Sequence, residues 1–408
     1  MKQPLNALII HEGDAAQEAV AINDHIFMAR AVSNSYLVTT SDGDVLINTG
    51  MPHQGEEIKA RFARVSGNPV RTIVLTQGHI DHIGGWNCFH RPGVSTIAQA
   101  NFGDVREYWT RLTAFITGRT GKLWARDRDS RINPATFPPE PVPTVTFVDS
   151  HSFTMGERRF ELYSTPGGET TDSLVVWLPD ERTAFTGNLT GPLFGHVPNL
   201  YTVRGDKIRS AIAFIHSVDR VLALEPELLI TGHGEPIRGA EQIRRQLTRI
   251  RDATAYLRDK TFEGMNAGLD LWTLMGRISL PPELALPQGH GKVPWIVRAI
   301  WEEHVGWFRY ESTTELYDVP PSTIWAEVAE LAGTDALVAR AESHLAAGRP
   351  LQALHFTGIA LARDPAHEPA LLAKLGAHRV LLERSGRENF SEVRWLESEI
   401  RDTEEALP

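Results

Sequence analysis

In the first 235 residues, short apolar runs rich in Val, Ile, Leu and Phe alternate with loops that carry glycine. Runs of this length, bounded by turn residues, predict β-strands. The predicted strands are residues 35–40, 44–48, 71–76, 95–98, 144–148, 159–164, 174–178, 182–186 and 227–231. Helical stretches are predicted among them at 54–65, 101–116 and 206–224. Strands mixed with helices in this order predict layered α/β packing.

Strand signals end near residue 237, and helical periodicity follows. The predicted helices are residues 240–259, 294–309, 323–331, 335–347, 351–363, 368–385 and 390–405. Segment 345–365 looks like one tetratricopeptide-type helix pair; a single pair cannot form a solenoid, so we expect a small helical domain. The polar, Pro-rich segment 126–143 predicts a long surface loop or lid.

Composition narrows the class of protein. The chain has 408 residues, of which 42% are apolar and 23% charged, as in ordinary soluble globular proteins. Its net charge of −10 disfavours binding to a phosphate backbone, so we expect no nucleic-acid partner. No apolar stretch approaches the roughly 20 residues of a membrane helix, and the N-terminus lacks a signal-peptide pattern, so we expect no membrane association and a cytoplasmic location. The single cysteine, Cys88, excludes an intrachain disulfide.

Four potential metal ligands lie in one short loop. Gln77, His79, Asp81 and His82 directly follow the apolar run 72–75. In extended backbone, residues 77, 79 and 81 would project alternately, and a turn would bring His82 back, so the loop can serve two adjacent metals. The alternative is a surface loop with two incidental histidines, which the segments described next disfavour.

The loop Thr76-Gln-Gly-His-Ile-Asp-His82 resembles the Thr-His-x-His-x-Asp-His signature of the metallo-β-lactamase superfamily, with Gln77 in place of the first His. Further segments resemble that family's landmarks in the expected order: Val45-Leu-Ile-Asn-Thr-Gly50, Thr165-Pro-Gly-Gly-Glu169, Phe185-Thr-Gly-Asn188 and Ile230-Thr-Gly-His-Gly234. The resemblance implies an αββα sandwich and a zinc-dependent hydrolase. It also implies that Glu169, Asn188 and His233 join the loop as metal-site residues.

The position of Glu169, one residue after the usual His, is similar to the alkylsulfatase branch. Asn199-Leu-Tyr-Thr-Val-Arg-Gly205 resembles that branch's sulfate-contacting motif, which implies substrate contacts from Asn199, Tyr201 and Arg204. Trp295 stands where the branch usually has a His, and we expect it to contact the substrate; His290 could substitute for the His from nearby.

The C-terminal helices resemble the branch's dimerisation domain, which implies a homodimer. We therefore expect a catalytic domain at 1–260, a helical connection contributing to the pocket at 261–320, and a helical dimerisation domain at 321–408.

Three positions that are usually His or Asp carry neutral amides: Asn48, Gln77 and Asn188. Asn188 cannot supply the bridging carboxylate of a dinuclear site, and Gln77 offers zinc only a weak oxygen donor. We therefore expect one tightly bound zinc at Asp81, His82 and His233, with Asn188 as a possible amide ligand. The second site, at Gln77, His79 and Glu169, would be weak or empty.

Three protein ligands with an open position are the pattern of catalytic zinc, which lowers the pKa of bound water to roughly 7. The hydroxide would attack a hydrophobic small-molecule substrate, first of all a sulfate ester. Without a second metal, His79 and Glu169 would be free for proton transfer, His79 as a base; alternatively both still bind metal. Asp81 is expected at the catalytic centre as a ligand rather than a base.

Two further interpretations stay open. One is a dehalogenase, ether hydrolase, esterase or lactonase with a mononuclear zinc site, because a similar Asp/His/Asn/His arrangement occurs in a hydrolytic aromatic dehalogenase of the superfamily. The other is a non-catalytic, degenerate family member, which the three amides make possible. Retained Asp81, His82 and His233 favour an enzyme.

Overall fold

The computed structural model describes residues 18–124 and 139–408. Most of the lid loop predicted at 126–143 therefore lies outside the described residues. Among those that are described, no helix is both long and apolar enough to cross a membrane.

The first sheet has seven strands in chain order. They are β1 (Val20–Ala21), β2 (Ile26–Ala29), β3 (Ser35–Val38), β4 (Asp44–Ile47), β5 (Val70–Val74), β6 (Ser95–Gln99) and β7 (Val145–Phe147). The first four pair antiparallel, whereas β4 to β7 pair parallel. Because Ile47 is paired with Val74, the segments that follow β4 and β5 leave the sheet at the same edge.

The second sheet has six strands in the order β13-β12-β11-β10-β9-β8. Their bounds are β8 (Ser150–Met155), β9 (Arg158–Ser164), β10 (Leu174–Leu178), β11 (Thr183–Gly187), β12 (Leu228–Thr231) and β13 (Ile237–Arg238). Only the β11–β12 pair is parallel. Gly187 is paired with Thr231, so Asn188 and His233 also leave their strands side by side.

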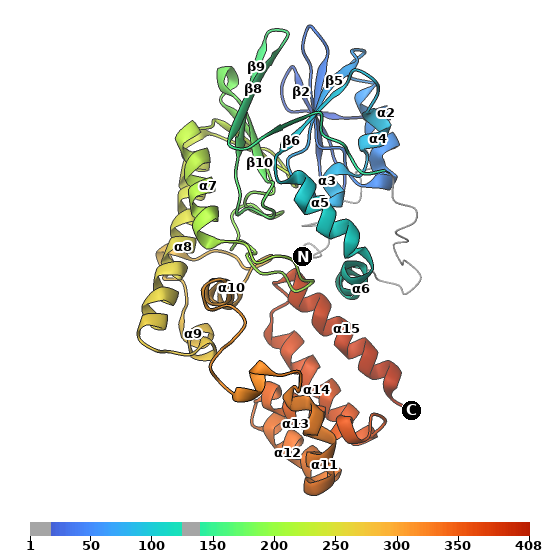
Figure 1. The fold of residues 1–408 in the computed structure, drawn as a ribbon, viewed down its shortest axis with the longest axis vertical. Helices are drawn as coiled ribbons and strands as arrows, with labels where there is room; N and C mark the ends of the chain where they lie inside the picture. The colour runs from blue at the N-terminus through green and yellow to red at the C-terminus, as the bar shows by residue number, and fades with distance from the viewer. Residues whose placement is uncertain (1–17, 125–138) are drawn as a thin grey trace. The chain divides into compact units, whose positions relative to one another are not determined.

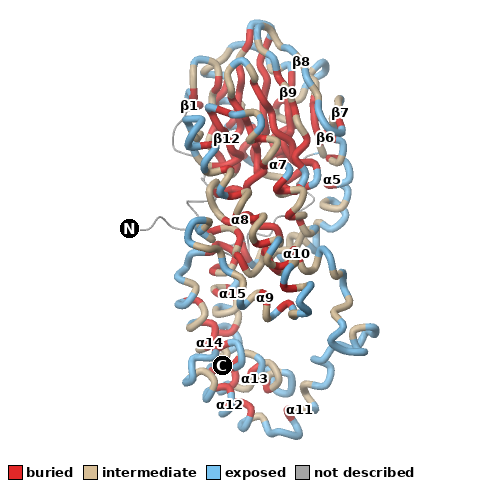
Figure 2. The backbone as a smooth tube through the Cα atoms, turned by 90° about the vertical axis from the view of Figure 1, so that its left-hand side faces the viewer, coloured by how far each residue is buried: buried red, intermediate tan, exposed pale blue. Residues whose placement is uncertain are grey.

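The two sheets pack face to face around one apolar core. Tyr36 and Val74 of the first sheet and Phe185 and Ile230 of the second belong to the same buried cluster, and the rings of Tyr36 and Phe185 lie 5.5 Å apart in an edge-on arrangement. Figure 2 shows buried residues gathered along these strands.

Helices cover both outer faces (Figure 1). The outer face of the first sheet packs on α2 (Gly55–Phe62) and α4 (Trp86–Phe89). The outer face of the second packs on α7 (Ala211–Leu224) and α8 (Ala240–Asn266). The predicted αββα sandwich is therefore confirmed.

Each predicted strand exists, but four strands were missed: β1, β2, β8 and β13. β8 was not predicted because its sequence, Ser-His-Ser-Phe-Thr-Met, is largely polar, and its side chains are exposed or only partly buried. The helix predicted at 101–116 is wrong as one element, because it breaks at Leu112 into α5 (Phe102–Arg111) and α6 (Thr113–Trp124). The helix predicted at 206–224 begins only at Ala211, where the Ser210 hydroxyl caps it by accepting from the Ala213 N–H at 3.3 Å.

The described chain divides into two compact units. The first holds the described residues through Thr117 and from 139 to Glu303; the second holds the described part of α6 from Gly118 and residues 304–408. The first also includes α9 (Leu271–Arg277) and most of α10 (Val293–Val305). The second contains α11 (Trp325–Ala332), α12 (Thr334–Ala346), α13 (Pro350–Arg363), α14 (Glu368–Arg384) and α15 (Phe390–Ala406). The domain boundaries expected at 260 and 320 stay predictions.

The second unit is built around alanine-lined helix contacts. Ala341 of α12, Ala353 of α13 and Ala377 of α14 share one buried cluster, which lets these helices approach closely. The tetratricopeptide-like segment 345–365 thus lies within a larger helical assembly, as expected for part of a small helical domain.

Candidate metal centre

The loop after β5 has two parts. Gln77 and His79 lie in its first part, with His79 in extended conformation at φ −72° and ψ 144°. Asp81 and His82 lie in a short helix, α3 (Ile80–Ile83). The expected extended backbone through residue 81 is therefore wrong. The turn of helix is held by neighbouring strand ends, since the Thr49 N–H donates to the His82 carbonyl at 2.8 Å and the Ser33 hydroxyl donates to the Asp81 carbonyl.

Three of the predicted ligands converge on one point. Asp81 Oδ2 lies 3.3 Å from His82 Nε2 and 3.6 Å from His233 Nε2. Their ligand atoms all lie within 4.8 Å of one another. A tetrahedral zinc with bonds of about 2.0–2.1 Å sets neighbouring ligand atoms about 3.3 Å apart. The spacing of the three side chains therefore fits a zinc ion.

Two buried atoms at this point, one of them the His82 ligand atom itself, also suit a cation. His82 Nε2 and Asn188 Oδ1 are buried and have no hydrogen-bond partner among the described residues. Gly232 makes their approach possible, because a Cβ at this position would lie 2.2 Å from Asn188 Oδ1 and 2.9 Å from His82 Cε1. Buried polar atoms normally have partners. An electron-poor ligand at this point would satisfy both.

The electrostatics of the three groups favour the charge states that metal ligands have. Burial lowers the pKa of His82 to about 4 and also lowers that of His233. Burial alone would raise the pKa of Asp81, but His82 and His233 beside it lower it. Two neutral imidazoles and one carboxylate are the ligand forms that zinc requires.

The second predicted set is also brought together, but inside an ion-pair network. His79 Nδ1 lies 3.1 Å from Gln77 Nε2 and 3.5 Å from Glu169 Oε2. On its other side, His79 Nε2 lies 3.6 Å from Asp206 Oδ2 and 3.5 Å from Arg204 Nη2. Burial opposes the charged form of His79, yet hydrogen bonds to Asp206 and Glu169 raise its pKa.

Both oxygens of Glu169 are occupied by protein groups. Oε2 accepts from Asn188 Nδ2 at 2.9 Å. Oε1 lies 3.1 Å from His290 Nε2 and 3.4 Å from Arg209 Nη1. Burial would raise the pKa of Glu169, but Arg209, His290 and His79 hold it well below its usual range. The carboxylate is thus surrounded by donors.

Two residues of this network were missed in the sequence. Arg209 is only 5% exposed, donates to the Asn199 carbonyl at 2.5 Å, and lies 4.0 Å from Asp206. Asp206 accepts from the Tyr108 hydroxyl at 2.8 Å. Burial opposes ionisation of Asp206, but His79 and the two arginines lower its pKa. Both residues precede Ser210, and recognising that serine as a helix cap would have placed them in a loop rather than in α7.

Residues 29–233, half of the chain, match the family model of the metallo-beta-lactamase superfamily. The chain belongs to the metallo-β-lactamase superfamily. Residues 274–389 match a second family model, that of alkyl sulfatase dimerisation.

Curated relatives extend the likeness. A linear primary-alkylsulfatase of Pseudomonas sp. (strain ATCC 19151) is 30% identical over 319 residues, which are 70% of this chain and 58% of that protein. The alkyl/aryl-sulfatase BDS1 of Saccharomyces cerevisiae is 22% identical, over 78% of this chain and 54% of its own length. The chain thus spans little more than half the length of these relatives.

The solved structure of a stereoselective inverting sec-alkylsulfatase, Pisa1 from Pseudomonas sp., matches with a TM-score of 0.82 at 20% identity, covering 96% of this chain and 66% of that one. At this identity the match shows the fold.

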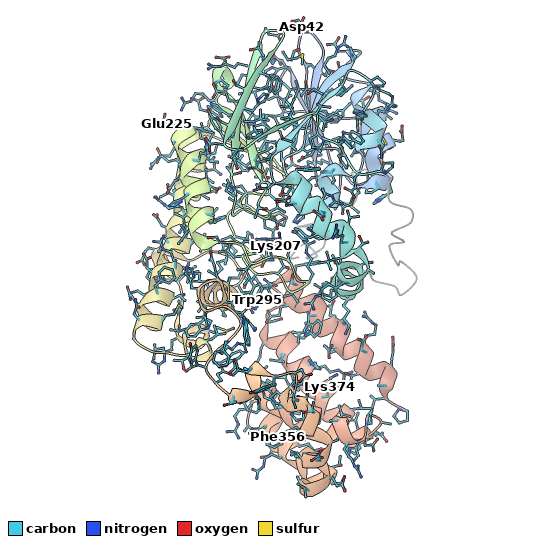
Figure 3. All side chains as sticks on the ribbon, in the orientation of Figure 1. Asp42, Lys207, Glu225, Trp295, Phe356 and Lys374 are labelled. Atoms are coloured by element: carbon cyan, nitrogen blue, oxygen red, sulfur yellow. The ribbon has the colours of Figure 1, made fainter. Side chains whose placement is uncertain are left out.

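Within this superfamily fold, the segment 199–209 lies beside His79 and Glu169. The Arg204 guanidinium stacks 5.0 Å from the Trp109 ring and approaches His79. Asn199 supplies its carbonyl to Arg209, while its own side-chain Oδ1 is buried without a hydrogen-bond partner among the described residues. Lys207, labelled in Figure 3, marks this loop, and its backbone N–H binds Asp206 at 2.8 Å.

The loop before α10 carries His290 to the site. It is tied to the segment before Asn199, since the Val197 N–H donates to the Pro287 carbonyl at 2.9 Å and the Gly291 N–H donates to the Val197 carbonyl at 3.1 Å. His196 contributes to this loop as an acceptor for the Gly289 N–H at 3.2 Å. His290 therefore contacts Glu169, and its role in place of the branch's usual His stays a prediction.

The remaining predicted substrate contacts, Tyr201 and Trp295, each lie near a cation. The Arg298 guanidinium is 5.9 Å from the Tyr201 ring, and the Lys292 ammonium is 5.9 Å from the Trp295 ring. Their roles stay predictions.

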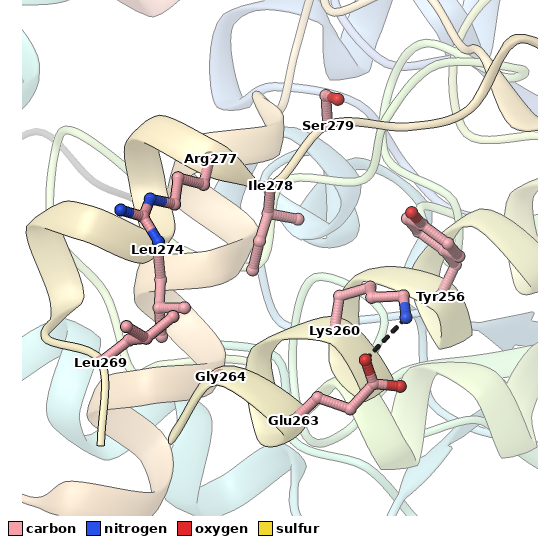
Figure 4. A pocket seen from close by; sticks show the side chains of 9 residues that line it. All are labelled: Tyr256, Lys260, Glu263, Gly264, Leu269, Leu274, Arg277, Ile278 and Ser279. Carbon is pink, nitrogen blue, oxygen red and sulfur yellow. Dashed lines mark hydrogen bonds and ion pairs between the residues drawn. The ribbon is translucent and has the colours of Figure 1, made fainter. Parts of the chain in front are cut away.

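A pocket of about 370 Å³ lies between α8 and α9 and the segment after them (Figure 4). It is lined by Tyr256, Lys260, Glu263, Gly264, Leu269, Leu274, Arg277, Ile278 and Ser279. None of these residues is among the proposed metal ligands, and Lys260 Nζ forms an ion pair with Glu263 Oε2 at 2.6 Å. The candidate functional site is therefore the group formed by Asp81, His82 and His233 rather than this pocket.

Proposed function

We propose that the chain is a zinc-dependent hydrolase that cleaves a sulfate ester of a hydrophobic small molecule. Asp81, His82 and His233 would hold a single zinc, with Asn188 Oδ1 as a possible further ligand atom. The observation that carries the proposal is the convergence of these three ligand atoms within 4.8 Å beside an unpartnered Asn188 oxygen.

A second metal is disfavoured by the charges around Glu169. Arg209 and His290 already lie against Glu169 Oε1, and Arg204 lies against His79. At an effective dielectric of about 20, a guanidinium 4 Å from a divalent ion opposes its binding by roughly 8 kcal/mol, which cancels the attraction of one carboxylate at the same distance. The protein's own cations thus take the place of the second metal ion.

A zinc bound at Asp81, His82 and His233 supplies an activated water with a pKa near 7. Arg204 has the planar, permanently charged guanidinium that suits the oxygens of a sulfate group. His79 lies between two carboxylates that favour its protonated form, and turning the Gln77 amide would set its unpartnered Oε1, in place of Nε2, against the proton on His79 Nδ1. The role we propose for His79 is therefore to donate a proton to the leaving oxygen rather than to act as the base expected from the sequence. Asp206 and Arg209 hold His79 and Glu169 in place.

The partner we propose is a second copy of the chain. Support comes from the dimerisation-family match and from aromatic side chains exposed after α10: Trp307 is 72% exposed, Tyr310 87% and Tyr317 68%. Contiguous exposed apolar residues mark interaction surfaces. Light scattering behind size exclusion should give twice the chain mass; a monomer at micromolar concentration would contradict the dimer. We also keep the cytoplasmic location as a proposal.

The proposal is tested by zinc content and turnover measured together. The substrate panel holds alkyl and aryl sulfates, lactones and electron-poor aryl halides. The zinc-loaded protein should hydrolyse a sulfate ester, and Asp81→Ala, His82→Ala and His233→Ala should each lose both zinc and activity. Turnover of a lactone or halide alone would overturn the substrate class, and zinc binding without any turnover would favour a non-catalytic member.

Gln77→Ala is the matched comparison within the same loop. Gln77 Nε2 lies 3.1 Å from His79 Nδ1, and the described residues show no hydrogen bond from Gln77 to the three proposed zinc ligands, so its loss should have a milder effect. A Gln77→Ala protein as inactive as Asp81→Ala would contradict the single-site arrangement.

A further inference from the structure

The two histidines of the proposed zinc site have neighbours of opposite kind. His233 Nδ1 lies 2.7 Å from the Val32 carbonyl oxygen, which can only accept. His233 Nδ1 therefore carries the proton, and Nε2 presents its lone pair to the site. His82 Nδ1 lies 3.0 Å from Asn48 Nδ2, an amide nitrogen that can only donate. His82 Nδ1 must therefore accept, and the proton of the neutral ring lies on Nε2.

The direction of the Asn48 amide follows from the backbone. Its Oδ1 accepts from the Thr76 backbone N–H and from the Thr76 hydroxyl, both at 3.0 Å. A backbone N–H cannot accept, so turning the amide over would set Nδ2 against another donor. Asn48 and His82 are both buried.

The proton on His82 thus lies where a metal would bind. Nε2 faces Asp81 Oδ2 at 3.3 Å. Binding zinc through Nε2 moves the proton to Nδ1, where it meets the amide donor of Asn48. Metal-binding histidines almost always donate their second N–H to a carboxylate, a carbonyl or water, as His233 does.

We propose that Asn48 is a positioning residue that holds His82 in the tautomer opposed to zinc binding and so weakens the site. Loss of an outer partner of this kind typically lowers metal affinity roughly 10–100-fold. The inference rests on the proposed function only in taking His82 as a zinc ligand. The consequence is a site that exchanges zinc more readily than one with an acceptor at position 48.

The test joins a tautomer measurement with a zinc titration. In zinc-free protein labelled with ¹⁵N-histidine, NMR should show His82 protonated on Nε2 in the wild type and on Nδ1 in Asn48→Asp. The variant suits the backbone, because Asn48 has φ 61°, a conformation that Asp also tolerates. Its carboxylate can accept from both Thr76 and His82. Zinc affinity, measured by chelator competition, should rise roughly 10–100-fold.

Asn266→Asp, the same change of an exposed amide at the end of α8, is the control and should leave both readouts unchanged. An Nδ1 proton in the wild type overturns the inference, and this measurement decides even if Asn48→Asp does not fold. An unchanged zinc affinity in a folded Asn48→Asp protein also overturns it. If Asp81→Ala leaves zinc affinity unchanged, the proposed metal site fails instead.

Discussion

Replacing Arg209 tests whether the protein's own cations hold the second half of the site together. Its Nη1 lies 3.4 Å from Glu169 Oε1, and its Nη2 lies 4.0 Å from Asp206 Oδ2. At an effective dielectric of about 20, these contacts are worth roughly 5 and 4 kcal/mol. Much of this gain offsets the cost of burying a guanidinium that is 5% exposed. Arg209→Met leaves the two carboxylates under-compensated, and removing one partner of a buried pair typically costs about 3–5 kcal/mol.

The free energy of unfolding should therefore fall by about 3–5 kcal/mol in Arg209→Met, measured by urea unfolding of zinc-free protein. Arg209→Lys is the matched control, since it keeps the charge near Glu169. It loses the planar donor that also reaches the Asn199 carbonyl, so it should lose about 1.5–3 kcal/mol, the value of one charge-assisted hydrogen bond. A loss below about 1 kcal/mol in Arg209→Met would refute the reasoning.

Three further predictions concern the same site. Gly232→Ala places a Cβ against Asn188 Oδ1 and should weaken zinc binding tenfold or more, about 1.4 kcal/mol, in a competition titration. Gly276→Ala, which has open space around it, is the control and should leave zinc affinity unchanged. Equal zinc affinities of the two variants would be inconsistent with this geometry. Arg204→Ala should raise KM for a sulfate ester about tenfold or more in steady-state assays, and an unchanged KM would exclude it as the anion contact. Because the pKa of Glu169 is lowered in the folded state, its contribution to stability is present above the unfolded value near 4 and is lost as pH falls through the folded pKa; acid unfolding that is the same in Glu169→Gln and wild type would contradict this.

The sandwich and the loop with the proposed metal ligands could be predicted because the apolar runs that mark strands agree with the order of the family motifs. Apolar runs such as Leu174–Leu178 are buried throughout and read as strands directly. The motifs end strands that pair in parallel, β4 with β5 and β11 with β12. Parallel strands end at the same edge of a sheet, which is how the structure brings together residues that only the family resemblance had linked.

The ion-pair network could not be predicted in the same way. The helical pattern of the sequence predicts a helix from residue 206, whereas α7 begins at Ala211. Asp206 and Arg209 were therefore assigned to a helix instead of to the loop before it. Their function depends on contacts with Glu169 and His79, which lie far away in the sequence. Tyr108 likewise belongs to no recognisable motif, and its hydroxyl donates to Asp206 at 2.8 Å.

The sequence also could not predict which ring nitrogen of His82 carries the proton. Asn48 could be recognised as an amide in place of the usual acid, but only the contact with Thr76 N–H fixes which end of the amide faces His82. Short-range geometry of this kind has no signature in residue spacing.

The most direct test of the account is the number of zinc ions held per chain. The protein is loaded with excess zinc, dialysed against a weak chelator, and analysed by elemental mass spectrometry against an independent protein concentration. We expect one zinc per chain in the wild type and none in His233→Ala. Two tightly bound zincs per chain would contradict it, because the second would have to bind among Arg209, His290 and Arg204.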